Sequence, residues 1–217
     1  MYIPPPFEET RPDVLHAVIA RHPLGVLVTN GAGGLDANHL VFELDPRQGA
    51  HGVLRTHVAR ANPVWQQIAS GDEMLVVFRA ADAYISPNWY PTKYETHKEV
   101  PTWNYVVVHA HGRAQIRDDV RYLRGLVGHL VKTQEASQPV PWKMADSPQA
   151  FIDEELKAIV GIDVEVTRLI GKAKLGQNRE LRDVHGAAAG LRAKGPNAIA
   201  DAMLEYAARR GSSDEDR

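Results

Sequence analysis

The segment 54–63 gathers side chains that suit the binding of a phosphate group. Its sequence, LRTHVARANP, places a hydroxyl, an imidazole and a guanidinium group at Thr56, His57 and Arg60. We expect a strand to end here and a helix to begin at His57, where free N–H groups and the positive end of the helix dipole favour anions. An arginine adds a bidentate fork for phosphate. The pattern is compatible with a phosphate pocket, although a capped helix with a solvated arginine is the more common case.

A second candidate is the aromatic segment 84–105. It contains two of the four tryptophans and four of the seven tyrosines, together with amide and hydroxyl side chains. This density of rings suits a planar aromatic ligand or a protein interface. A corner of the core beside a proline-rich loop explains the same residues, so three interpretations stay open.

Three weaker patterns have plain structural explanations. The polar and basic segment 172–179 follows a predicted strand and is typical of a solvated loop. His109 and His111 alternate along one strand as two metal ligands would, but a third ligand at a characteristic spacing is missing from the pattern. The arginines of segment 113–124 form a basic stripe that two aspartates interrupt, which favours a solvated face over nucleic-acid binding.

The elements that must position these groups are short strands followed by helices. Because the strands are separated mostly by turns, and no dinucleotide-binding or P-loop motif is present, a doubly wound fold is disfavoured. We expect a small barrel with helical additions. The expected strands are 24–29, 35–44, 52–57, 73–80, 83–85, 103–116 and 159–169, and the expected helices are 10–21, 57–70, 120–133, 147–156 and 185–210, with a break at Gly195 and Pro196.

Composition excludes several classes of protein. The chain has 217 residues, 44% of them hydrophobic and 24% charged, a formal net charge of −2, and no cysteine. It is therefore neither disordered, nor a disulfide scaffold, nor a thiolate metal site. No stretch approaches the ~18 apolar residues of a membrane span, and the N-terminus lacks signal-peptide features, so we expect a cytoplasmic protein. We expect one domain over residues 1–211 and a frayed tail over 212–217.

Taken together, these segments resemble the PaiB family of FMN-binding proteins, which are often labelled negative transcriptional regulators. The resemblance runs almost from end to end, with departures at three positions: Asn38 in place of the usual Thr, Val41 in place of Pro, and Gly176 in place of Ser. The matching strings are Met1–Pro4 with Phe7, ANHL at 37–40, HVARANP at 57–63, YISP at 84–87 with Trp89 and Tyr90, VPTWNY at 100–105, IVGI at 159–162, and KLGQNR at 174–179.

The resemblance implies an α+β, mainly antiparallel split β-barrel of the pyridoxamine phosphate oxidase type. It also implies a homodimer that holds FMN noncovalently at the subunit interface, with no metal. It assigns no catalytic residue. The implied cofactor residues are Thr56, His57 and Arg60 at the phosphate, Asn62 supporting the turn, Asn38 and His39 along the flavin ring, Thr102, Trp103 and Asn104 completing the cleft, and Gln177 and Arg179 approaching from the C-terminal loop.

Three functions are compatible with this site. The resemblance implies a transcriptional regulator with DNA as a partner, although the net charge of −2 and the lack of a clear helix-turn-helix pattern weigh against direct DNA binding. The alternative is a flavin-dependent oxidoreductase acting on an unknown small molecule, since the cofactor carries the chemistry. A third is a dimer whose site is vestigial or holds another ligand.

Overall fold

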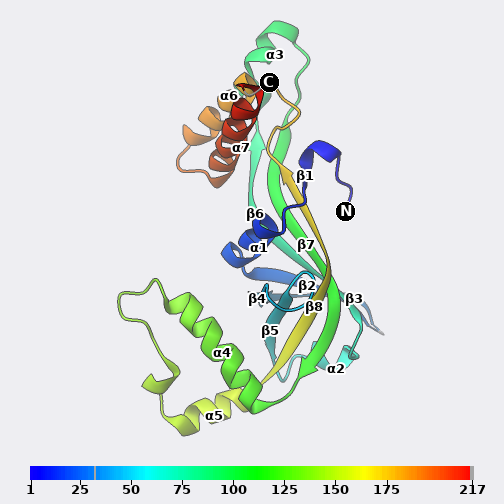
Figure 1. Cartoon of the computed structure of the whole chain (residues 1–217), viewed down its shortest axis with the longest axis vertical. Helices are drawn as coiled ribbons and strands as arrows, with labels where there is room; N and C mark the ends of the chain where they lie inside the picture. The colour runs from blue at the N-terminus through cyan, green and yellow to red at the C-terminus, as the bar shows by residue number, and fades with distance from the viewer. Residues whose placement is uncertain (32, 216–217) are drawn as a thin grey trace. The chain divides into compact units, whose positions relative to one another are not determined.

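The computed structural model describes residues 1–31 and 33–215 (Figure 1). These residues form two compact units. One comprises Met1–Arg11, Arg79–Val108 and Ile170–Arg217, and the other comprises Pro12–Phe78 and His109–Leu169. Three long strands, β6 (Glu73–Ile85), β7 (Thr102–Arg117) and β8 (Ile159–Lys174), contribute residues to both units. The expectation of one domain over 1–211 stays a prediction.

The described strands form one sheet in the order β3-β2-β6-β7-β8-β5-β4, with β1 added to β8. The pairings of β1 with β8, β2 with β3 and β6, and β5 with β4 and β8 are antiparallel, as the turn-rich pattern predicted. The bounds of the remaining strands are Glu8–Glu9 for β1, Leu24–Gly31 for β2, Gly34–Val41 for β3, Glu43–Asp45 for β4 and Val53–Ala59 for β5.

In the unit that contains Pro12–Phe78, alternate residues of the strands form the core. Leu27, Leu54, Val76, Phe78 and Ile162 are fully buried, as expected when one face of each strand points inward. The helices of this unit are α1 (Pro12–Arg21), α2 (Val64–Gln67), α4 (Val120–Glu135) and α5 (Gln149–Lys157), with a 3₁₀ turn, η3, at Met144–Asp146. The helices α4 and α5 lie together in Figure 1, and Leu123 of α4 packs with Ile152 and Leu156 of α5.

In the other unit, two alanine-rich helices pack on the ends of the long strands. They are α6 (Leu181–Arg192) and α7 (Ala198–Glu215), and η1 (Pro5–Phe7), η2 (Pro87–Trp89) and α3 (Pro91–Thr96) complete the unit. Trp89 lies directly against α6: a Cβ atom at Gly190 would come within 2.4 Å of the Trp89 ring, and one at Gly186 within 2.2 Å of its carbonyl oxygen. Both glycines are therefore required by close packing.

The structure corrects two of the predicted elements. The helix expected from His57 is wrong, because β5 continues to Ala59 while His57 and Val58 pair with Gly161 and Val160 of β8; only Val64–Gln67 is helical. The predicted strand 35–44 is interrupted at Phe42, whose N–H donates to the Pro23 carbonyl at 2.8 Å. The predicted loop after Ser86 contains the short helix α3. The other predicted strands and helices are confirmed, with 73–80 and 83–85 joined into β6.

Candidate functional site

Thr56 and His57 lie on opposite faces of β5. Thr56 is fully buried on the core face, and its hydroxyl donates to the Val41 carbonyl at 2.8 Å. His57 is half-buried on the other face. Its Nδ1 atom is buried and has no hydrogen-bond partner in the part of the chain that the structure describes. Burial lowers the pKa of His57, which keeps the imidazole neutral at pH 7.

Arg55 shares the face of His57, because residues two apart on a strand point the same way. Its Nε atom is also buried without a partner among the described residues, and only these two atoms combine these properties there. A buried N–H group without an acceptor costs about 1–3 kcal/mol. Sequence analysis missed Arg55, because the helix expected at His57 concealed the alternation that places both side chains on one face.

Arg60 follows β5, and its guanidinium group is already engaged. It donates to both carboxylate oxygens of Asp118, at 2.5 and 2.9 Å, and to the carbonyl oxygens of Lys157 and Ile159 at 2.7 and 3.1 Å. These bonds join the end of β5 to the turns before α4 and β8. To bind phosphate, Arg60 would have to exchange Asp118 for the new anion.

The structure brings Asn38 and Asn62 together. The Asn62 amide donates to Asn38 Oδ1 at 2.8 Å, and Asn62 Oδ1 accepts the N–H of Val64 at 2.9 Å, which closes the turn before α2. Asn38 also donates to Asp36 at 3.0 Å. The neighbouring His39 is exposed on β3. The two amides therefore lie together, whereas His39, the next residue along β3, points to the opposite face of the strand.

Thr102, Trp103 and Asn104 lie in the other unit, at the start of β7, in three different environments. The Thr102 hydroxyl accepts a hydrogen bond from Lys174. Trp103 is 54% exposed and meets Tyr84 edge-on, with 6.1 Å between ring centroids. Asn104 is buried, and its amide donates to the sulfur of Met203 at 3.4 Å. Of the three, Trp103 is the side chain most available to a ligand or to another subunit.

Gln177 and Arg179 lie in the loop between β8 and α6, in the same unit as Trp103. Gln177 Oε1 accepts the N–H of Leu175 at 2.7 Å, and its amide donates to the Ala173 carbonyl. Arg179 pairs with Glu99, and its guanidinium lies 4.9 Å from the centroid of the Tyr90 ring. Gly176 has φ of +91°, a conformation that glycine adopts without strain and that a serine would not.

The predicted cofactor residues thus divide between the units. Asn38, His39, Thr56, His57, Arg60 and Asn62 belong to one, and Thr102, Trp103, Asn104, Gln177 and Arg179 belong to the other. Their assembly around one flavin stays a prediction. Among the described residues there is no cluster of three or more His, Asp or Glu side chains suited to a metal ion.

The fold has clear relatives among solved structures. The structure of the FAD and heme binding protein from Mycobacterium smegmatis matches with a TM-score of 0.57 at 15% identity, over 77% of this chain and 73% of that one. At this level of identity the likeness concerns the fold alone. The molecule is an α+β, mainly antiparallel split β-barrel, as the sequence led us to expect.

Sequence comparison defines the family. The family model described as "Putative FMN-binding domain" matches residues 1–168. The Bacillus subtilis protein named "Protease synthase and sporulation protein PAI 2" is 32% identical over 184 residues, 84% of this chain and 85% of that protein. An uncharacterized protein of Emericella nidulans is 29% identical over 233 aligned positions, 91% of this chain and 93% of that protein. The chain belongs to the PaiB family of FMN-binding proteins, and FMN is its cofactor.

His57, on the half-buried side of β5, fits this cofactor. The Nδ1 atom of His57 is unpaired. In one tautomer it donates a hydrogen bond to a phosphate oxygen, and in the other it accepts one from a phosphate hydroxyl. The chain has no cysteine through which a flavin could be tethered, which is consistent with noncovalent binding. Within the described residues, no helix is long and apolar enough to cross a membrane.

Burial of His57 predicts a dependence of stability on pH. The pKa of His57 in the folded protein lies below its ordinary value of 6.5. As the pH falls below about 6.5, the unfolded chain binds a proton that folded His57 does not, so the free energy of unfolding decreases. Urea unfolding between about pH 7.5 and pH 5 measures this loss. The range extends about one pH unit or more to each side of the ordinary His pKa.

His57→Gln should reduce the slope of that loss without removing it, because burial also lowers the pKa of His109 and His111. Replacement of His185, which is exposed on α6, by Gln serves as the control. Equal slopes for His57→Gln and the wild-type protein would show that His57 is not held neutral by the fold.

Proposed function

We propose that the protein acts as an FMN-binding homodimer that regulates transcription. The observation that carries the cofactor assignment is the unpaired, buried Nδ1 atom of His57, in a chain whose family binds FMN. The regulatory role is supported by family membership, since a relative is named for protease synthesis and sporulation. A cytoplasmic location accompanies this proposal.

The homodimer is supported by large apolar side chains that stay exposed in the single chain. Leu35 and Val41 are 79% and 41% exposed on β3, the strand that carries Asn38 and His39. Tyr84 and Trp103 are 44% and 54% exposed in the other unit. A second copy would cover such groups next to the predicted cofactor residues. Sedimentation velocity should then give twice the chain mass of 24.0 kDa, and a monomer with FMN present would refute the dimer.

In the proposed complex the chain binds and orients the cofactor. His57 meets the phosphate end, and Asn62 fixes Asn38 in one orientation through the 2.8 Å hydrogen bond between their amides. FMN, when bound, supplies one- or two-electron transfer. The family resemblance implies that Trp103 would help to complete the cleft.

Direct DNA binding is the part of the proposal most open to test. Two arginines of the stripe in 113–124 are engaged in ion pairs, Arg117 with Asp163 and Arg124 with Asp153, while Arg121 has no ion-pair partner among the described residues. We expect the protein to retard DNA from its own promoter region in a gel shift at low salt, and FMN to change the retardation. No shift with or without FMN would contradict a direct regulator.

A flavin-dependent oxidoreductase is the second candidate, in which His57 would lie beside the flavin ring instead of the phosphate, and its neutral state favours this function. A half-buried imidazole that is neutral at pH 7 can accept or donate a proton at Nδ1. Anaerobic bleaching of the bound flavin by NADH or NADPH tests this function. Reduction no faster than that of free FMN would exclude a reductase with these donors.

A further inference from the structure

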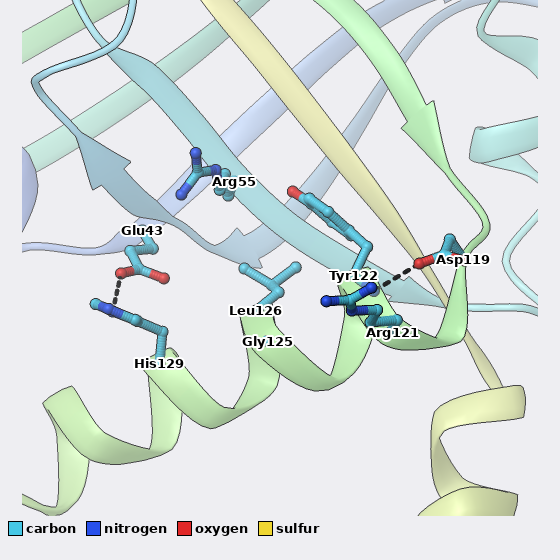
Figure 2. Close-up of a pocket in the computed structure, with 8 residues that line it drawn as sticks. All are labelled: Glu43, Arg55, Asp119, Arg121, Tyr122, Gly125, Leu126 and His129. Atoms are coloured by element: carbon cyan, nitrogen blue, oxygen red, sulfur yellow. Dashed lines mark hydrogen bonds and ion pairs between the residues drawn. The ribbon is translucent and has the colours of Figure 1, made fainter.

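A cavity of about 540 Å³ lies between the middle of α4 and the sheet (Figure 2). Arg55 of β5 and Glu43 of β4 line it from the sheet. Tyr122, Gly125, Leu126 and His129 line it from the helix. None of the predicted cofactor residues lines it. Its volume lies within the range of about 300–1,000 Å³ that is typical of small-molecule sites.

Three charged residues form a row across the sheet beneath α4. Arg55 pairs directly with Glu43 of β4 on one side and with Asp163 of β8 on the other, and directly paired residues share one face of a sheet. Both carboxylates already have partners on α4. Asp163 accepts the Tyr122 hydroxyl, and Glu43 lies 2.5 Å from His129 Nδ1. The helix is therefore held at two points, and the cavity lies between them above Arg55.

Arg55 is the member of the row with unmet hydrogen-bonding capacity. Its side chain is 23% exposed, and its nearest ion partner is Asp45 at 3.4 Å. The Nε–H group is buried and finds no acceptor among the described residues. Since an unpaired buried donor is costly, an acceptor oxygen inside this cavity would be bound favourably.

Gly125 keeps the cavity open. A Cβ atom at Gly125 would meet no other atom within 4 Å, so packing does not require a glycine here. Glycine in a helix interior costs about 1 kcal/mol relative to alanine. Its absent side chain leaves space beside Leu126, which points toward the sheet, and beside the ring of Tyr122 (Figure 2).

We propose that this cavity binds a small organic carboxylate, whose oxygens accept hydrogen bonds from Arg55 and whose apolar body packs on Leu126 and Tyr122. Arg121, which also lines the cavity, has no ion-pair partner among the described residues and adds a second positive charge. The carboxylates of Glu43 and Asp163 are already paired with α4, and Asp119, which also lines the cavity, accepts the N–H of Tyr122 at 2.7 Å. Arg55 therefore still lacks an anionic acceptor. The apolar side chains of Leu126 and Tyr122 favour an acceptor with an organic body. The site is separate from the proposed flavin site and does not depend on the regulatory role.

Isothermal titration of the FMN-loaded full chain with benzoate tests the proposal. We expect benzoate to bind and the uncharged analogue benzyl alcohol to bind at least tenfold more weakly, because the alcohol is a poorer acceptor for Arg55. Arg55→Met should weaken benzoate binding at least tenfold. Arg47→Met is the matched control, since Arg47 pairs with the same Asp45 but is 88% exposed outside the cavity.

Gly125→Leu keeps the proposal testable if Arg55→Met does not fold. The new side chain occupies the cavity and should abolish benzoate binding, whereas Gly128→Ala on the same helix, outside this cavity, should leave it unchanged. Three results would overturn the proposal: no binding of millimolar benzoate, equal binding of benzyl alcohol, or binding of benzoate to the flavin-free and riboflavin-loaded chain but not to the FMN-loaded chain. The last would assign Arg55 to the flavin phosphate.

Discussion

Asp163→Ala should lower the free energy of unfolding by about 2 kcal/mol, because it removes a charge-assisted hydrogen bond and leaves the hydroxyl of half-buried Tyr122 without its acceptor. The Asp163 side chain is only 8% exposed and accepts hydrogen bonds from Arg117 Nε at 2.8 Å and from the Tyr122 hydroxyl. Burial of the ring and the bond to Asp163 raise the pKa of Tyr122. Without the carboxylate the Tyr122 hydroxyl loses its acceptor, while Arg117, which is 37% exposed, still reaches water. Urea unfolding measures the loss.

Two variants separate the contributions to this loss. Tyr122→Phe removes one hydrogen bond and should cost about 1 kcal/mol. Asp118→Ala breaks the more exposed ion pair with Arg60 and should cost no more than about 1 kcal/mol. If Asp163→Ala costs no more than Asp118→Ala, the buried network does not hold α4 on the sheet, and the cavity beneath α4 is not preformed.

His57→Phe should reduce the affinity for FMN by about 10- to 100-fold, which is the effect of losing a hydrogen bond to a charged group worth about 1.5–3 kcal/mol. Phenylalanine keeps a ring of similar size at this half-buried position of β5 but has no nitrogen for the phosphate. Riboflavin lacks the phosphate, so its affinity should change little. Titration of flavin fluorescence with each variant measures both constants.

Controls make this result specific to the phosphate. His57→Gln keeps a polar group and should retain part of the affinity for FMN, and His185→Ala on the exposed face of α6 should retain all of it. An equal loss of FMN and riboflavin affinity in His57→Phe would place His57 at the flavin ring or in the fold. An unchanged affinity for both would remove it from the site.

Local patterns in the sequence predicted most of the fold. The apolar spacing of 120–133 predicted α4, and the β-branched residues of 24–29 and 103–116 predicted β2 and β7. The segment after Thr56 was mispredicted because its conformation depends on β8, about 100 residues later in the chain, which pairs with His57 and Val58. Such long-range pairing overrides local propensity.

The same limit applies to the candidate site. HVARANP and the other matching strings together identified the family and its cofactor, but the local pattern could not show that Thr56 faces the core or that Arg60 is bound to Asp118. These outcomes depend on strand alternation and on partners distant in the sequence. Arg55 lacked any motif of its own, and it became visible only through its unpaired Nε atom.

The most direct test of the central claim is the visible absorption spectrum of the chain after incubation with FMN and removal of free flavin by gel filtration. We predict a flavin spectrum that elutes with the protein at one FMN per chain, in a species of twice the chain mass, and a weaker signal with riboflavin. A colourless protein peak after incubation with micromolar FMN would contradict the account.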